Sequence, residues 1–176
     1  MDANSEWFRA TDKEAKLAYF WKDPESRTYE DRLLLKYWRQ VGGLIITEVP
    51  IGRDGPRQWP PGAKQGRIDG VRLVAPPPSL SDGIHEFGRD SRVMTENLIA
   101  GARVEVIEVK RDLNQHVLGQ VIAGADLLEM EYAPAQVDPV VVCAVGDPAL
   151  EAVCERRSIA VLVSAAEQVF TEVPSR

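Results

Sequence analysis

Residues 104–110 read VEVIEVK, a short segment rich in β-branched residues that closes with an acid and a lysine. Valine and isoleucine favour strands, and the side chains of a strand alternate between its two faces. Glu108 and Lys110 are therefore expected on one face, with valines behind them. A carboxylate and an ammonium group at the end of an apolar strand are an unusual placement of charge, which makes this strand end a candidate functional position.

A second strand-like segment, RIDGVRL at residues 67–73, carries one further acid, Asp69. If Asp69 approaches Glu108 and Lys110 from a neighbouring strand, two carboxylates and a lysine converge. Such a group is suited to metal-assisted hydrolysis. Taken alone, each of these two sequence patterns is ordinary. Glu-x-Lys ends many strands, and an Asp-Gly pair is as often a turn or a bulge.

The composition is that of one globular domain. The chain has 176 residues, of which 44% are hydrophobic and 27% charged, enough to bury a core. We expect a single domain over residues 1–176, with its core at about 28–163 and an N-terminal extension at 1–27. No apolar run approaches the ~20 residues of a membrane span, and the N-terminus lacks the regions of a signal peptide. A cytoplasmic location without membrane contact is the default expectation.

The net charge of −6 argues against a protein that coats nucleic acid. Basic residues nevertheless gather between residues 52 and 72, a segment that contains five basic residues and only two acidic ones. This segment could hold a phosphate backbone, or its charges could simply be solvated. The candidate nucleic-acid-binding residues are Arg53, Arg57, Lys64, Arg67 and Arg72.

Caps, periodicity and breakers predict an alternation of helices and strands. Thr28 and Asp112 are the expected N-caps of the two main helices, and Asp147-Pro148 that of a third. A long connection at 79–102 is expected to hold one helical turn near 92–98. The predicted helices are 29–40, 112–132 and 149–156, with further ones at 10–20 and 164–170; the predicted strands are 44–51, 67–74, 103–110, 138–145 and 159–163.

The order of these elements predicts an α/β fold. The first three strands are joined by loops, so at least one antiparallel pair is expected, and the helix 112–132 then returns the chain for a parallel strand. The result is a mixed central sheet flanked by helices, with a core order αβββαβ and an extra αβ unit at the C-terminus.

With this order and these acids, the chain resembles the PD-(D/E)xK nuclease superfamily, which has the restriction-endonuclease-like fold. The resemblance covers roughly residues 28–163. It places the family's aspartate at Asp69 on the second strand and its (D/E)xK triplet at Glu108-Val109-Lys110 on the third. Ile68 stands where the family's motif has proline, so one letter of the motif is missing.

The resemblance implies a Mg²⁺ (or Mn²⁺) site and assigns further residues to it. Asp69, Glu108 and the backbone carbonyl of Val109 would be ligands, joined in some branches by a glutamate of the first helix, here Glu30. Glu48 is a rival for that last role. Lys110 would orient or deprotonate the water, or offset charge on the scissile phosphate; a partly desolvated lysine with a lowered pKa could act as the base.

Gln120, on the helix after the triplet, matches a glutamine of some branches that would hold the water or the lysine. Its alternative is an ordinary polar residue of the helix surface. The implied catalytic residues are therefore Asp69, Glu108, Lys110 and Gln120.

The implied function is metal-dependent hydrolysis of phosphodiester bonds in DNA, in a restriction, repair, recombination or phage-defence setting, with RNA left open as a substrate. The alternative is an inactive nuclease-like subunit that binds a protein or a nucleic acid. Because many relatives dimerise to cut both strands, a homodimer or a larger protein complex is a further expectation.

Overall fold

The computed structural model describes residues 28–78, 80, 82–86 and 92–164. The expected helix at 10–20 and nearly all of the one at 164–170 lie outside these residues. Four helices and six strands follow one another along the described chain: α3 (Tyr29–Val41), β1 (Leu44–Gly52), β2 (Gln65–Leu73), β3 (Gly83–Glu86), α4 (Arg92–Ile99), β4 (Arg103–Asp112), α5 (Gln115–Tyr132), β5 (Gln136–Val145), α6 (Pro148–Arg156) and β6 (Ala160–Val163).

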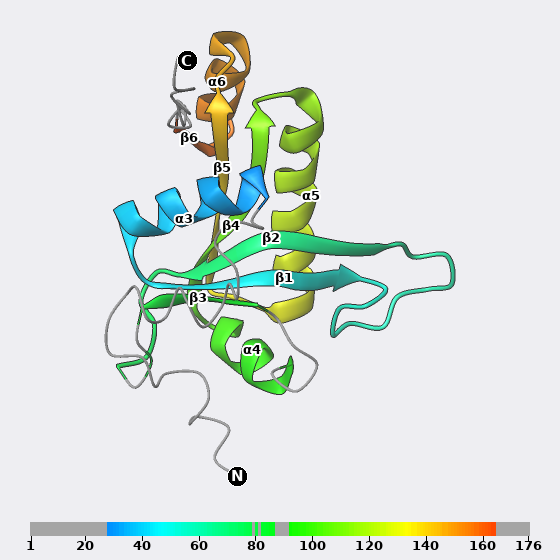
Figure 1. Ribbon diagram of the computed structural model, residues 1–176. Helices are drawn as coiled ribbons and strands as arrows, with labels where there is room; N and C mark the ends of the chain where they lie inside the picture. Colours follow the sequence, from blue (N-terminus) through cyan, green and yellow to red (C-terminus); the bar gives the residue numbers. More distant parts are fainter. Residues whose placement is uncertain (1–27, 79, 81, 87–91, 165–176) are drawn as a thin grey trace, which may run out of the picture.

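The six strands form one mixed sheet in the order β3-β1-β2-β4-β5-β6. The pairs β1–β2 and β2–β4 are antiparallel, whereas β1–β3, β4–β5 and β5–β6 are parallel. Helix α5 connects β4 to the parallel strand β5 (Figure 1). The predicted mixed α/β class is therefore confirmed, including the antiparallel start and the parallel return after the crossover helix.

Helix α3 begins where its cap predicts. The Thr28 and Asp31 side chains each accept a hydrogen bond from the other residue's backbone N–H, both at 3.1 Å, a reciprocal capping box. The helix ends at Gly42, whose φ of 64° is one that glycine adopts without steric cost. This cap fixes the start of α3, and with it the position of Glu30, next to the strand ends.

Helices cover both faces of the sheet (Figure 1). The core under α5 joins that helix to β1, β2 and β4 through side chains such as Ile46, Ile68, Val106 and Val121. The second core, under α3, includes Trp38, which has no exposed surface. The sheet is thus buried on both sides, which explains why its central strands are so apolar.

Two strands change face at the same level of the sheet. Ile46 and Val49 both lie in the core under α5, although residues three apart in a regular strand face opposite sides. The same holds for Ile68 and Val71 on β2. In β1 the change coincides with Glu48, whose φ of 58° is in the left-handed region and costs on the order of 1–3 kcal/mol. Residues 47–48 and 69–70 therefore form a break in the alternation of both strands.

Two sequence predictions need correction. Strand β3 was not predicted; it lies within the long connection 79–102 and pairs in parallel with β1 at the edge of the sheet. The cap of α5 is Asn114, not Asp112, because Asn114 Oδ1 accepts the N–H of Val117 at 3.0 Å. Asp112 still belongs to β4, where it pairs with Val145. The predicted helical turn near 92–98 is confirmed as α4.

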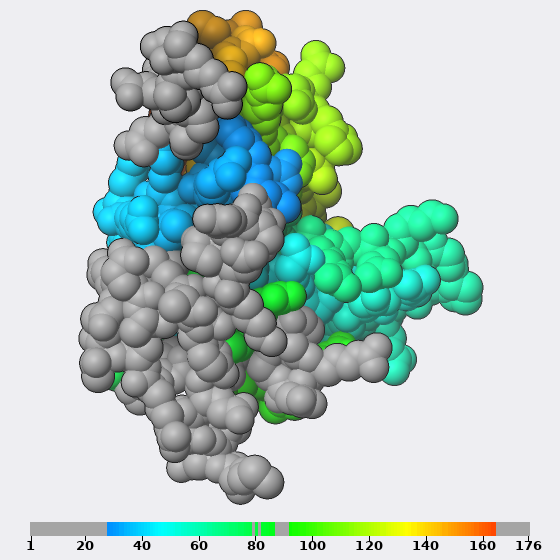
Figure 2. All heavy atoms as spheres, viewed as in Figure 1, coloured from blue at the N-terminus to red at the C-terminus, as the bar shows by residue number. Residues whose placement is uncertain are grey.

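Beyond the break, β1 and β2 continue as a hairpin arm, residues 50–67, that projects from the body of the molecule (Figures 1 and 2). Its base is held by Glu131 near the end of α5, which accepts the N–H of Gly52 at 2.8 Å and the indole N–H of Trp59 at 2.9 Å. The arm is thus tied to the helix that covers the central strands.

Candidate functional site

Asp69 lies where β2 and β4 separate. The last pair of the β2–β4 ladder is Gly70 with Ile107, so Asp69 is the first residue beyond it. Its Oδ2 accepts the backbone N–H of Val109 at 2.8 Å. The carboxylate therefore satisfies a strand donor that the diverging backbone does not reach, and the hydrogen bond holds Asp69 against the triplet Glu108-Val109-Lys110.

Glu108 is a buried acid with 3% of its surface exposed, and it faces α5, where a Cβ built on Gly124 would lie 3.7 Å from its Oε1. Burial, followed by the charge of Asp69 and a hydrogen bond with it, raises the pKa of Glu108 to about 8. Burial also raises the pKa of Asp69, against the opposing effects of the Val109 amide and Lys110. Two carboxyl groups therefore share a place that is unfavourable for two negative charges.

Lys110 completes the group. Its Nζ lies 2.9 Å from Glu30 Oε1 and 4.0 Å from Asp69 Oδ2. Burial alone would lower the pKa of Lys110, but the hydrogen bond to Glu30 and the charges of Asp69, Glu30 and Glu108 outweigh it, so its pKa is raised. Of the roles expected for Lys110, this arrangement favours the one that offsets charge on a phosphate over that of a base with a lowered pKa. Lys110 is held as a cation.

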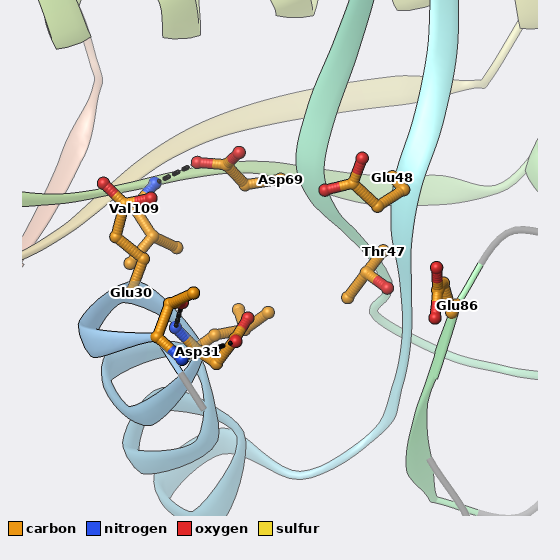
Figure 3. A pocket seen from close by; sticks show the side chains of 9 residues that line it. Glu30, Asp31, Thr47, Glu48, Asp69, Glu86 and Val109 are labelled. Carbon is orange, nitrogen blue, oxygen red and sulfur yellow. Dashed lines mark hydrogen bonds between the residues drawn. The ribbon is translucent and has the colours of Figure 1, made fainter. Parts of the chain in front are cut away.

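An acidic cavity of about 430 Å³ opens beside this group (Figure 3). Figure 3 shows Glu30 and Asp31 approaching it from α3, with Thr47, Glu48 and Glu86 across from them. Five of its lining residues are acids and none is basic. The residues that line it are Thr28, Glu30, Asp31, Leu34, Thr47, Glu48, Asp69, Glu86 and Val109.

The donor chemistry of the site fits a hard divalent cation. Asp69 and Glu108 supply carboxylate oxygens, and a cation beside them would offset the effect of burial, which is the largest cause of their raised pKa values. Across the described residues, no three His, Cys, Asp or Glu side chains gather into a metal centre of their own. An ion here would therefore depend on these two carboxylates together with backbone oxygen, such as that of Val109, and water.

Gln120 lies on α5, one turn before Gly124, which faces Glu108. Residues four apart share a helical face, so Gln120 is on the side of α5 that covers the triplet. Its Oε1 is buried and has no hydrogen-bond partner among the described residues. A buried amide oxygen without a partner is unusual, and it is available to a water molecule or a cationic side chain.

Four of the five candidate basic residues lie on the hairpin arm, and Arg72 lies apart from them. Arg72 is a structural residue: it donates to Glu105 at 2.8 Å and to the carbonyl oxygen of Gly42 at 2.8 Å. Arg57 stacks over the ring of Trp59, 4.8 Å from its centroid. The exposed Lys64 also lies on the hairpin arm, as do Arg53 and Arg67. Arg67 pairs with Glu48 at 3.0 Å, so it reaches the border of the acidic cavity.

Several cavity residues were not found by sequence reasoning. Glu86 ends β3, a four-residue strand without a clear pattern, and Thr47 is a plain strand residue. Asp31 was expected only as part of a helix start. Glu48 and Glu30 were rivals for one role, yet both line the cavity. Glu48 also has a left-handed backbone, which the sequence does not reveal.

Comparisons of the chain with protein-family models, with curated proteins and with solved structures found no match. Within the described residues, no helix combines the length and apolar character needed to cross a bilayer.

Proposed function

We propose that this protein is a metal-dependent nuclease that hydrolyses phosphodiester bonds in DNA, with a restriction-endonuclease-like fold and a PD-(D/E)xK-type site. The observation that carries the proposal is the meeting of Asp69 with Glu108 and Lys110, where Asp69 also lines the acidic cavity. These residues come from two strands and are about 40 positions apart in the chain. An ion pair that only stabilised the fold would not require a second carboxyl group, that of the buried Glu108, because burying it costs free energy.

Asp69 and Glu108 would hold a Mg²⁺ or Mn²⁺ ion through carboxylate oxygens. When bound, such an ion stabilises negative charge on a phosphate and lowers the pKa of a coordinated water. Its charge would favour the ionised form of Glu108, whose pKa is raised in the metal-free protein. Metal binding and deprotonation of this carboxyl are thus expected together.

Lys110 would act as a fixed positive charge rather than as a base. Its Nζ is anchored by Glu30 at 2.9 Å and stays protonated because its pKa is raised. Aimed at a scissile phosphate, it would stabilise the charge that builds up in the transition state. Gln120 Oε1, buried and without a partner among the described residues, would position a water or the ammonium group.

The test is a cleavage assay on plasmid, linear and branched DNA with Mg²⁺ or Mn²⁺. Asp69→Asn and Lys110→Ala are expected to lose about a hundredfold or more of the activity. Asp126→Asn, which removes an acid from the exposed face of α5, is the matched control and should cleave like the wild type. Circular dichroism checks that each variant is folded.

Two outcomes would contradict the proposal. One is cleavage by Lys110→Ala at the rate of the wild type. The other is a wild-type protein that cuts none of these substrates and binds no divalent ion in a calorimetric titration; that result would favour an inactive nuclease-like binding module.

A further inference from the structure

A second hollow, of about 670 Å³, lies next to the acidic cavity. The two share Glu48, which lines both. Its other lining residues come from the hairpin arm and from the start of α4. They are Pro50, Arg53, Asp54, Gly55, Arg67 and Arg92. We call this hollow the basic groove.

The two hollows have opposite character. The basic groove has three arginines among its lining residues and two acids, whereas the acidic cavity has five acids and no basic residue. An acidic cavity attracts cations and an arginine-lined groove attracts anions. Side by side, they fit a ligand that carries a cation-bound phosphate at one point and further phosphates next to it, as a nucleic-acid strand does.

The arginines of the groove are held by weak, exchangeable partners. Arg53 pairs with Asp54, Arg67 with Glu48 and Arg92 with Glu96, each at 3.0 Å. Their side chains are 64%, 55% and 46% exposed. Exposed ion pairs contribute little to stability, so a phosphate can replace the carboxylate at small cost and accept two hydrogen bonds from the guanidinium.

Arg92 joins the arm to the body of the protein. It is the first residue of α4, and its Nη2 donates to the carbonyl oxygen of Gly55 on the hairpin arm at 2.8 Å. It lies in the long connection 79–102, where the sequence gave no reason to single it out. The groove is therefore built by both strands of the hairpin arm and by the start of α4, which only the fold brings together.

We propose that the basic groove binds phosphates of the DNA strand that neighbour the phosphate at the acidic cavity, through Arg53, Arg67 and Arg92. This inference rests on the proposed function, since the acidic cavity fixes where the strand is cut. The path of the strand over the protein would then run from the acidic cavity past Glu48 to the hairpin arm. Arg57, Lys64 and Arg72 do not line the groove and are not needed for this binding.

The test measures the salt dependence of binding rather than cleavage. Binding of the full chain to a fluorescein-labelled DNA duplex is followed by anisotropy in Ca²⁺, between 50 and 200 mM salt. Each lost phosphate contact changes the slope of log K against log salt by about 0.9. The triple variant Arg53→Gln, Arg67→Gln and Arg92→Gln should therefore change the slope by about 2.7. The wild type's affinity advantage over this variant should shrink about fortyfold across this range of salt.

Arg103→Gln is the matched control. Arg103 also forms an exposed ion pair, with Asp138 at 2.8 Å and with 57% of its side chain exposed, but it lies at the start of β4, away from the groove. It should keep the slope of the wild type. The three single variants, each expected to change the slope by about 0.9, serve if the triple variant unfolds.

The inference and the proposed function fail in different ways. If the slope for the groove variants equals that of Arg103→Gln, the proposal that the groove binds phosphates is refuted, even if the wild type cleaves DNA. Absence of cleavage in Mg²⁺ and Mn²⁺ would instead refute the proposed nuclease activity. The binding experiment would still test whether the groove binds phosphates. A slope change in the groove variants together with impaired cleavage would support both.

Discussion

Replacing Glu108 by glutamine tests whether the carboxyl group of this residue is held neutral inside the metal-free site. Glutamine has nearly the shape of a protonated glutamate and can donate the same kind of hydrogen bond to Asp69. It cannot ionise. The variant should therefore be more stable than the wild type at any pH where the carboxyl group is ionised in the unfolded chain and burial opposes its ionisation in the folded chain.

The magnitude follows from the pKa. In the folded protein the pKa of Glu108 is about 8, against an ordinary value of 4.5. Below pH 4.5 both folded and unfolded chains hold the proton. Above it the unfolded chain loses the proton while the folded chain keeps it, so the free energy of unfolding falls by up to about 1.4 kcal/mol per pH unit. By pH 7 the accumulated loss is roughly 3 kcal/mol, and it levels off near pH 8.

The assay is urea denaturation without divalent ions at pH 5, 6, 7 and 8, followed by the fluorescence of tryptophan, including the fully buried Trp38. The stability advantage of Glu108→Gln should grow by roughly 2–3 kcal/mol between pH 5 and pH 7. Glu129→Gln, on the exposed side of α5, removes the same charge without burial and should show no such growth.

An advantage for Glu108→Gln that is equal at pH 5 and pH 7 would refute the reasoning, because it would mean that the carboxyl group ionises normally. Mg²⁺ adds a second readout. It should stabilise the wild type in a thermal melt, since binding to the folded state shifts the unfolding equilibrium, and have a smaller effect on the variant. A variant that is more stable yet inactive would show that the site is built at the expense of stability.

Three further substitutions test the structure that carries the site. Tyr37→Phe removes the hydrogen bond that Tyr37 donates to Glu105 at 2.6 Å and should cost about 1–3 kcal/mol in urea denaturation; an unchanged midpoint would contradict this. Thr28→Ala should cost about 1 kcal/mol through the lost helix cap, whereas Thr28→Ser should stay near the wild type, and equal losses would count against the cap. Glu131→Ala should speed hydrogen exchange of the Gly52 amide, whose acceptor it removes; unchanged exchange would show that the hairpin arm is held otherwise.

Much of the fold was predictable because its signals are local. Thr28 caps α3 through Asp31, only three residues away, and Asp147 caps α6 by accepting the N–H groups of Ala149 and Leu150. The apolar segment 138–145 was predicted as a strand, and it forms β5, an interior strand between β4 and β6. Strand β3 gave no such signal, because four residues at a sheet edge are defined mainly by their pairing with β1.

The candidate site was predictable only in part. The chemical types at Asp69, Glu108 and Lys110 stood out in the sequence, and these residues do come together. The pairing of Lys110 with Glu30 at 2.9 Å, which makes the lysine a fixed cation, did not follow from spacing. The left-handed Glu48, which borders both hollows, was equally hidden, because backbone strain depends on the packing around it.

Within the described residues, the sequence by itself determined every element except β3, together with the mixed α/β class, since periodicity, caps and helix-breaking residues act between residues a few positions apart. The charge states in the site were decided by tertiary structure alone. Whether Glu108 is neutral or Lys110 charged depends on burial and on groups that lie 40 or 80 positions away in the sequence. Electrostatic energy varies with distance and with access to water, and only the folded chain sets these two quantities.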